Sequence, residues 1–218
     1  MPNLNQINFL KSVREYIKEP ILIIGSKEYE YDEYNFLNEL NKLEFFDITG
    51  LDINHGSGVD VVMDICDLDA KYIQKKKSGF KTVLCMQTMY AVKNPFYASQ
   101  NIQKLLAKDG TLVFSDIFSH KINRVPTDYW RFTFDGQKIL FENIEFIESL
   151  TKIGVTRKNI LIDYSLPLPE ILKYTRNDSE TFMAYFLRKV YVKLFSNSFM
   201  NNQRLLPELS IHSLGIKK

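Results

Sequence analysis

A glycine and an aspartate occupy positions typical of a nucleotide-binding site. Gly25 closes the apolar run ILIIG (21–25), and Asp52 lies at the end of the next apolar run, FFDITGLDI (45–53). A carboxylate there can accept hydrogen bonds from both hydroxyls of a ribose, and each such charge-assisted bond is worth about 1.5–3 kcal/mol. The loop after Gly25 reads GSKEYEYDEY and lacks the G-x-G-x-x-G pattern, so a solvated aspartate at a strand end remains an alternative.

The elements that must position these residues alternate between strand and helix. Short apolar runs predict buried strands over residues 21–25, 45–53, 59–65, 81–87 and 111–118. Apolar residues at helical spacing predict helices over 4–18, 32–43, 68–77 and 95–108, the last of them stopped by Asp109-Gly110 as a C-cap. This alternation predicts an α/β fold with a doubly wound sheet that binds its ligands at the carboxyl ends of the strands.

The pattern changes after residue 141. Residues 143–155 predict a strand with flanks, and a helical stretch then runs to about residue 197. Its core, FMAYFLRKVYVKLF (182–195), is apolar nearly all round, which favours packing within the protein and leaves a dimer contact or a membrane surface as alternatives. Residues 209–218 predict a returning strand.

Three segments resemble those of a known enzyme family. GLDINHGSGVDVVMDICDL (50–68) resembles the second and third motifs of class I S-adenosylmethionine (SAM)-dependent methyltransferases. The segments at 94–118 and PTDYWRFT (126–133) are similar to those of a bacterial subgroup that acts on small polar molecules, often in polysaccharide pathways. The matches cover residues 20–145. They imply a Rossmann-like, mostly parallel sheet with an antiparallel C-terminal strand and a C-terminal helical insertion.

The resemblance implies SAM as the cofactor and eight residues that hold it: Gly25, Ser26, Asp52, Ile53, Asp64, Ile65, Met86 and Gln87. The first two would approach the methionine part through their backbone. The next two would bind the ribose hydroxyls and pack on adenine. Asp64 and the Ile65 amide would recognise the adenine edge, and the last two would line the methionyl side near the sulfonium. A helix-capping role for Asp64 and a core role for Met86 remain alternatives.

A hydroxyl acceptor would also need a base, which is typically worth 10²–10⁴-fold in rate. His120, after the fifth expected strand, is the first candidate, and Asp128 is the second. Asp116, Tyr129 and Arg131 are expected to bind substrate, with the guanidinium offering a fork to a carboxylate or phosphate. A surface-loop position for the histidine and a structural role for the DYWRFT block are the alternatives.

Composition and charge narrow the class of protein. With 218 residues, 45% apolar and 25% charged, the chain suits one globular domain. We expect an N-terminal helix (1–19), a cofactor-binding core (20–155), a helical insertion (156–207) and a returning strand (208–218). Two cysteines are too few for a disulfide framework, and no run suits a signal peptide or a membrane span, so we expect a soluble, cytoplasmic protein.

The charges also bear on the partners. The net charge of +2 argues against a nucleic-acid binder, and CMQT stands where base-methylating enzymes usually have (N/D)-P-P-(Y/F/W). Residues 151–218 carry 11 basic and 5 acidic residues, which suits a small anionic acceptor such as a sugar nucleotide or phosphorylated metabolite, or a membrane glycolipid. Solvated helices would explain the same distribution. A homodimer or peripheral membrane contact would involve residues 179–197. The three histidines lack ligand spacing, so no metal is expected.

Three function hypotheses follow. The first is a methyltransferase acting on an oxygen of a small polar, carbohydrate-related or anionic acceptor. The second is a SAM-binding or partner-binding protein without turnover, because the first loop has few glycines and Tyr90-Ala91 stands where the family commonly has Glu-His. The third is a nicotinamide-dependent Rossmann enzyme, which the missing G-x-G-x-x-G disfavours.

Overall fold

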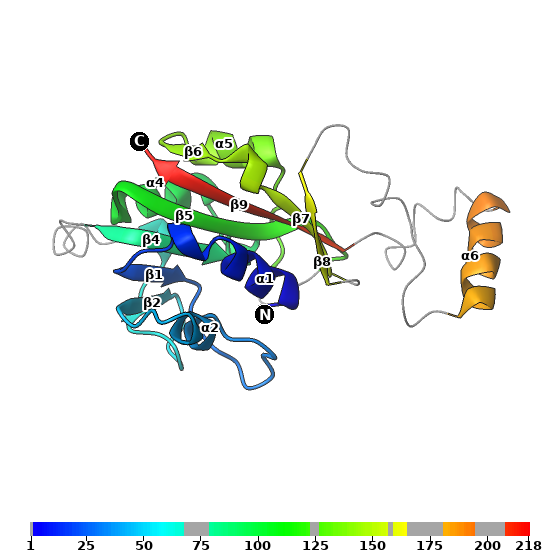
Figure 1. The fold of residues 1–218 in the computed structure, drawn as a ribbon, viewed down its shortest axis with the longest axis horizontal. Helices are drawn as coiled ribbons and strands as arrows, with labels where there is room; N and C mark the ends of the chain where they lie inside the picture. Colours follow the sequence, from blue (N-terminus) through cyan, green and yellow to red (C-terminus); the bar gives the residue numbers. More distant parts are fainter. Residues whose placement is uncertain (1, 68–78, 123–126, 157–158, 165–180, 195–207) are drawn as a thin grey trace.

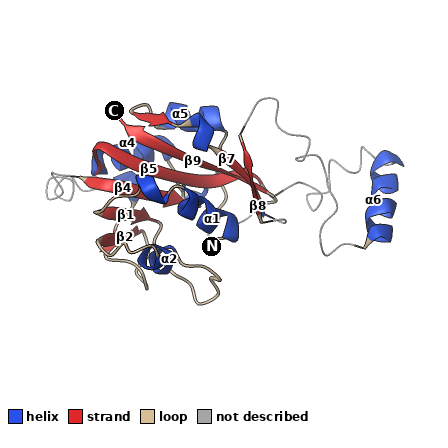
Figure 2. Cartoon of the chain, viewed as in Figure 1, coloured by secondary structure: helices blue, strands red, loops and turns tan. Residues whose placement is uncertain are grey.

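The computed structural model describes residues 2–67, 79–122, 127–156, 159–164, 181–194 and 208–218. Nine strands in these residues form one mixed sheet (Figures 1 and 2). The strands are β1 (Ile21–Ile24), β2 (Ile48–Asp52), β3 (Val61–Val62), β4 (Phe80–Met86), β5 (Leu106–Ser119), β6 (Ile144–Phe146), β7 (Lys152–Val155), β8 (Ile160–Asp163) and β9 (Leu209–Lys217). They lie in the order β3-β2-β1-β4-β5-β9-β7-β8, and β6 also pairs with β9.

The first five strands are parallel. β1 pairs in parallel with β2 and β4, β2 pairs with β3, and β4 pairs with β5. All four residues of β1 are buried, as expected where helices cover both faces of a sheet. β9 runs antiparallel to β5. The prediction of a Rossmann-like, mostly parallel sheet with an antiparallel C-terminal strand is therefore confirmed.

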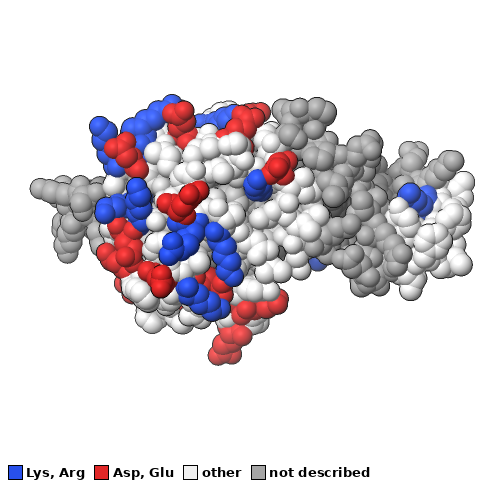
Figure 3. Space-filling view, viewed as in Figure 1, with Lys and Arg blue, Asp and Glu red and all other residues white. Residues whose placement is uncertain are grey.

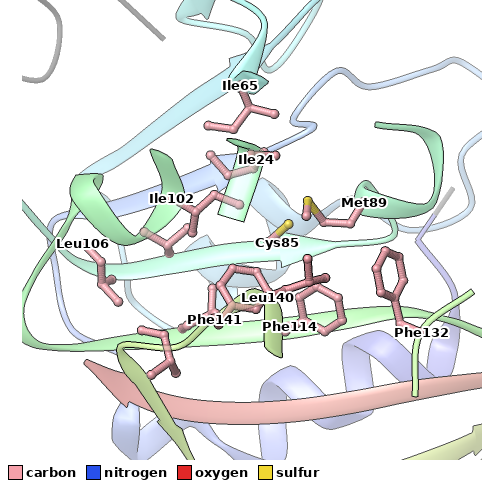
Figure 4. Packing of buried hydrophobic residues seen from close by; sticks show 14 of the residues in the cluster. Ile24, Ile65, Cys85, Met89, Ile102, Leu106, Phe114, Phe132, Leu140 and Phe141 are labelled. Atoms are coloured by element: carbon pink, nitrogen blue, oxygen red, sulfur yellow. The ribbon is translucent and has the colours of Figure 1, made fainter. Parts of the chain in front are cut away.

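Helices cover both faces of the sheet. α1 (Leu4–Ser12) and α2 (Phe36–Lys42) pack on one face, and α4 (Pro95–Leu105) and α5 (Phe134–Leu140) pack on the other. Alternate residues of β1 join the two layers: Ile23 contributes to the cluster under α1 and α2, and Ile24 to the cluster under α4 and α5. Figure 4 shows the second cluster, in which Phe114 lies between Phe132 and Phe141.

Each of these four helices begins at a side chain that caps its amide groups. Asn3, Asn35, Asn94 and Thr133 accept a hydrogen bond from the amide three residues ahead, which satisfies one otherwise unpaired donor of the first turn. Short 3₁₀ turns lie at Arg14–Tyr16, Ile65–Asp67, Met89–Ala91 and Glu148–Leu150. The helix expected over 4–18 therefore ends at Ser12, and the helix expected over 32–43 begins at Phe36. The helix expected over 68–77 lies outside the described residues.

The predicted helix stop at Asp109-Gly110 was wrong. α4 ends at Leu105, and β5 begins at the next residue. Asp109 takes a φ of 58° inside a register shift between β4 and β5. The Asp-Gly pair therefore allows an irregularity at the start of a strand, because these residue types tolerate positive φ there as readily as at a helix end.

The C-terminal third also differs from expectation. The strand expected over 143–155 is two strands, β6 and β7, separated by a 3₁₀ turn. β8 is a strand that pairs with β7, although its residues fall in the expected helical insertion. α6 (Phe182–Leu194) is a helix as predicted, but the prediction that it packs within the protein was wrong. Six of its large apolar side chains are exposed: Phe182, Met183, Phe186, Leu187, Val190 and Leu194. In the described part of the chain, no helix is long and apolar enough to cross a membrane.

His212 on β9 gives the protein a predicted sensitivity to acid. It is fully buried, and its Nε2 lies 2.8 Å from Ser210 Oγ. Burial penalises the imidazolium and lowers the pKa of His212 from 6.5 to about 3. The native state therefore favours the neutral ring, a stabilisation that is complete above pH 6.5 and is lost as the pH falls toward 3. The loss is about 1.4 kcal/mol per pH unit.

His212→Gln keeps a side chain that can bond Ser210 but cannot titrate. Urea unfolding of both proteins at pH 7 and pH 5 should show that the wild type loses about 2 kcal/mol more than the variant on acidification. Other buried groups, Asp116 among them, titrate alike in both proteins and cancel in this difference. Parallel losses would show that His212 is already solvated in the folded state.

Candidate functional site

A pocket of about 960 Å³ opens at the carboxyl ends of β1, β2 and β4. Its wall contains all eight residues expected to hold the cofactor: Gly25, Ser26, Asp52, Ile53, Asp64, Ile65, Met86 and Gln87. These residues come from four separate segments of the chain. Parallel strands that end at the same edge bring such segments together, so the pocket lies where a doubly wound sheet binds ligands.

The turn after β1 depends on a glycine. Gly25 has a φ of 72°, and a Cβ at this position would collide with the Thr88 side chain. Thr88 Oγ1 donates a hydrogen bond of 3.0 Å to the Ile24 carbonyl, so the residues after β1 and β4 are held against each other. Only a residue without a side chain fits this close approach.

β2 and the loop that follows it pack against the glycine-poor turn after β1. A Cβ on Gly50 would collide with the Gly58 carbonyl oxygen and would lie 2.7 Å from Ser26 Oγ. The Glu28 amide donates to the Ser57 carbonyl at 3.0 Å. Gly50 and Gly58 thus allow the close packing that a glycine-rich first loop would otherwise provide. The segment GLDINHGSG contained this signal, but the sequence analysis gave roles only to Asp52 and Ile53 and none to its glycines.

Asp52 anchors two backbone amides at the edge of the pocket. Its Oδ2 accepts from the Lys27 amide at 3.2 Å, and its Oδ1 accepts from the Asn54 amide at 2.8 Å. Each carboxylate oxygen has a second lone pair, so the group can still accept hydrogen bonds from two hydroxyls. Ile53 beside it is 61% exposed on the pocket wall, where a flat ring could cover it.

The structure shows the capping role of Asp64 and the core position of Met86, and both residues also line the pocket. Asp64 Oδ1 accepts from the Cys66 amide at 2.8 Å, as a cap of the turn Ile65–Asp67, and this uses one of its two oxygens. Met86 is 3% exposed in the core cluster under α1 and also lines the pocket. A capping or core role therefore does not remove either residue from the site.

Three polar atoms in the pocket wall are candidates for hydrogen bonds to a bound ligand. Ser26 Oγ, Asp32 Oδ1 and Gln87 Oε1 are buried and have no hydrogen-bond partner among the described residues. A buried polar atom without a partner costs about 1–3 kcal/mol, so such atoms are rare unless something else satisfies them. The amino-acid and ribose groups of SAM have the donors that these oxygens lack. The described residues therefore fit this cofactor.

The block that contains DYWRFT is joined to the loop after β4 and contributes Tyr129 to the pocket wall. The amides of Tyr129 and Trp130 both donate to the Tyr90 carbonyl, at 2.9 and 3.1 Å, and Trp130 Nε1 donates to the Val92 carbonyl at 2.8 Å. Phe132 is buried against Phe114. The block fastens the loop after β4 to the sheet, which supports its structural interpretation, and it also places Tyr129 on the pocket wall.

Arg131 and Asp128 bind each other. Arg131 Nη2 lies 2.9 Å from Asp128 Oδ2, and Nη1 contacts Oδ1, so the fork is bidentate. The Asp128 side chain is 5% exposed, and its carboxylate raises the pKa of Arg131. Neither residue lines the pocket. The Arg131 guanidinium, which was expected to bind an anionic substrate, therefore binds the carboxylate of Asp128, which was expected to act as a base.

His120 also lies outside the pocket wall. Its Nδ1 is 2.8 Å from the Lys121 carbonyl, and its own carbonyl accepts from Arg131 at 3.5 Å. In this structure, then, neither expected base touches the pocket. Both residues follow β5 in the sequence, but Arg131 binds the Asp128 carboxylate and the His120 carbonyl, and none of the three lines the pocket.

Asp116 is a buried anchor of the loop after β4. It is 1% exposed, its Oδ2 accepts from the Tyr90 amide at 3.1 Å, and its Oδ1 accepts from the Ile117 amide at 2.7 Å. Burial raises its pKa to about 7, against the opposing effect of the amide hydrogen bonds. The structure gives it a positioning role in place of the expected contact with substrate.

Four further tyrosines line the pocket, none of which the sequence analysis expected to bind a ligand: Tyr29, Tyr31, Tyr34 and Tyr90. Tyr29 and Tyr31 stack with ring centroids 5.3 Å apart, and burial raises the pKa of Tyr90 to about 12. The alternation in YEYDEY was the available signal. Acidic side chains outnumber basic ones in the wall, with Glu28, Asp32, Asp52, Asp60 and Asp64 against Lys27 and Lys93. The described residues contain no group of three side chains that could hold a metal.

Comparisons with known proteins agree with this geometry. A family model described as a methyltransferase domain matches residues 28–154, more than half of the chain. A search of curated proteins found no match. Among solved structures, the chain resembles a SAM-dependent methyltransferase from Archaeoglobus fulgidus with 16% identity and a TM-score of 0.53, covering 97% of this chain and 92% of that one.

Two further structures share the fold. The MccD protein has 15% identity and a TM-score of 0.54, covering 98% of this chain and 96% of that chain. The [4+2]-cyclase SpnF has 12% identity and a TM-score of 0.52, covering 97% of this chain and 81% of that chain. Identities this low establish likeness of fold alone.

Proposed function

The chain belongs to the class I SAM-dependent methyltransferase family, and from this premise we propose that it methylates an oxygen of a small, neutral, carbohydrate-like acceptor. One observation carries the proposal. A single pocket brings together the eight residues expected to hold the cofactor, three buried oxygens without hydrogen-bond partners among the described residues, and several tyrosines. When bound, SAM supplies an electrophilic methyl group on a positively charged sulfonium, and the acidic wall suits that charge.

The tyrosines favour a neutral acceptor over an anionic one. Aromatic rings and carboxylates can pack on and hydrogen-bond a polyhydroxylated ring, whereas phosphate recognition commonly uses an arginine fork. Arg131 is engaged by Asp128, and the pocket has more carboxylates than cations. Of the acceptors expected from the sequence, a carbohydrate hydroxyl therefore suits this wall better than a sugar nucleotide or a phosphorylated metabolite.

The chain's own contribution to catalysis would be positioning and the exclusion of water. Tyr90 and Tyr129 both line the pocket, and the high pKa of Tyr90 keeps its hydroxyl protonated. Asp116 and the DYWRFT block hold the loop that carries Tyr90. An acceptor held in line with the methyl group gains rate through orientation, which can be worth several kcal/mol of the barrier.

A non-catalytic SAM-binding or partner-binding protein is the second candidate. One observation favours it: among the described residues, neither His120 nor Asp128 reaches the pocket as a base. The likeness to the cyclase SpnF is consistent with a fold that serves chemistry other than methyl transfer.

Calorimetric titration with S-adenosylhomocysteine, with NAD as the control ligand, tests the shared premise. We expect one-to-one binding of the first ligand alone. Labelled SAM, offered with a panel of neutral saccharides and their phosphorylated counterparts, then tests the acceptor, and label should pass to the neutral members. Binding without transfer to any member would favour the non-catalytic candidate, and transfer only to phosphorylated members would contradict the neutral acceptor.

A further inference from the structure

The loop between β1 and α2 contains a tight turn in the pocket wall. The Tyr29 amide donates to Asp32 Oδ2 at 3.0 Å, and the Asp32 amide donates to the Tyr29 carbonyl at 2.9 Å. Both residues line the pocket. Aspartate side chains commonly bond to nearby backbone in turns, so one oxygen of the Asp32 carboxylate has a structural role.

The other carboxylate oxygen of Asp32 is not used by the turn. Asp32 Oδ1 is buried and has no hydrogen-bond partner among the described residues. Of the three such oxygens in the pocket wall, it alone belongs to a carboxylate, because the other two belong to a hydroxyl and an amide. A buried carboxylate oxygen without a donor is costly, and a cationic N–H donor offsets that cost better than a neutral one. The turn therefore suits the positively charged end of a ligand.

The other acidic side chains of the described wall are engaged elsewhere. Glu28 Oε2 accepts from Ser57 Oγ at 2.8 Å, and Asp60 Oδ2 accepts from the Gly50 amide at 2.7 Å. Two further acids are those expected to hold the ribose and the adenine. Within the part of the wall that the structure describes, Asp32 is thus the acid with a buried oxygen left for another ligand group.

The charge of this loop favours a cation. Residues 27–35 contain four acidic residues and one lysine. Figure 3 shows acidic side chains at the lower edge of the view, where Figure 1 draws the loop between β1 and α2. The lysine, Lys27, has its Nζ over the Tyr29 ring, 5.2 Å from the centroid. A local excess of negative charge attracts the cationic part of a ligand and repels an anionic part.

SAM has two positive charges, on its sulfonium and on its α-ammonium group, and only the second has N–H donors. We propose that Asp32 Oδ1 binds the α-ammonium group of SAM. The assignment rests on the proposed function, since it takes SAM as the ligand. Of the eight residues expected to hold the cofactor, those at its methionine end have no charged side chain, namely Gly25, Ser26, Met86 and Gln87. Asp32 supplies the negative charge that this end otherwise lacks.

Calorimetric titration with two ligands tests the contact. S-adenosylhomocysteine has the α-ammonium group, whereas its deamino analogue keeps the carboxylate and lacks that group. Asp32→Asn keeps an oxygen for the Tyr29 amide and directs an NH₂ group into the pocket. This variant should bind S-adenosylhomocysteine on the order of 10- to 100-fold more weakly than the wild type, and the deamino ligand no more weakly. Asp32→Ser, whose hydroxyl can also accept from that amide, should give the same pattern.

Glu30→Gln is the matched control, because Glu30 is exposed in the same turn, does not line the pocket and loses the same charge. It should bind both ligands as the wild type does, and circular dichroism and thermal unfolding check that every variant folds. Equal losses for the two ligands in both Asp32 variants would overturn the proposal, because the contact would then be to another part of the ligand. Wild-type affinity of Asp32→Asn for S-adenosylhomocysteine would also overturn it. A wild-type protein that binds neither ligand would refute the proposed function itself, and the proposal with it.

Discussion

Asp52→Ala is expected to reduce affinity for S-adenosylhomocysteine by at least 100-fold. The carboxylate would lose two charge-assisted hydrogen bonds to the ribose, each worth about 1.5–3 kcal/mol. The change also removes the acceptor for the Lys27 and Asn54 amides, which shape the pocket's edge. Calorimetric titration measures the loss directly, and circular dichroism and thermal unfolding report whether the fold survives.

Asp47→Ala is the matched control for this variant. Asp47 precedes the opposite end of β2, is exposed and does not line the pocket. It should bind the ligand with wild-type affinity. Asp52→Asn keeps one acceptor oxygen and should fall between the two. An Asp52→Ala protein that binds S-adenosylhomocysteine with wild-type affinity would mean that Asp52 does not hold the ribose.

The parallel half of the fold and the cofactor wall were predictable because local signals decide them. A strand buried on both faces must be apolar throughout, as β1 is, and parallel strands must end at one edge. Residues just after such strands therefore meet, whatever lies between them in the sequence. This rule and a family resemblance together led to the eight residues expected to hold the cofactor, and all eight line the pocket.

The acceptor side was not predictable in the same way. Which side chain meets Arg131 depends on how the loop after β5 folds back onto the loop after β4, and a sequence contains no direct measure of that. Two residues separated by three positions looked like independent functional groups, yet they neutralise each other. Likewise Asp116 followed the strand pattern correctly, but alternation along β5 points it into the core under α4 and α5.

The exposure of α6 and the packing against the loop after β1 could not be predicted from the sequence, for different reasons. An apolar helix is compatible with a core, a dimer or a membrane, and periodicity alone does not choose among them. Gly50 and Gly58 matter through atoms that approach from another loop, so their role depends on tertiary contacts. Glycine spacing in one loop is an incomplete test for a nucleotide site when a second loop can supply the close packing.

Arg131→Leu should destabilise the protein by about 3 kcal/mol, although Arg131 was first expected to bind substrate. The variant leaves the Asp128 carboxylate, which is 5% exposed, without its guanidinium partner. Removing one member of a buried ion pair costs about 3–5 kcal/mol, and the lower end applies because the Arg131 side chain is 32% exposed. Urea unfolding at pH 7 measures the change.

The double variant Asp128→Asn/Arg131→Leu separates the two roles of the arginine. If the residues serve each other, the added Asp128→Asn change removes the buried charge that Arg131 balanced, and the double variant should be more stable than Arg131→Leu alone. Because the pair backs the loop that carries Tyr129, the single variant should also raise KM for the acceptor more than it changes affinity for the cofactor. If Arg131 instead binds an anionic acceptor, its loss should spare stability, and the second substitution should recover nothing.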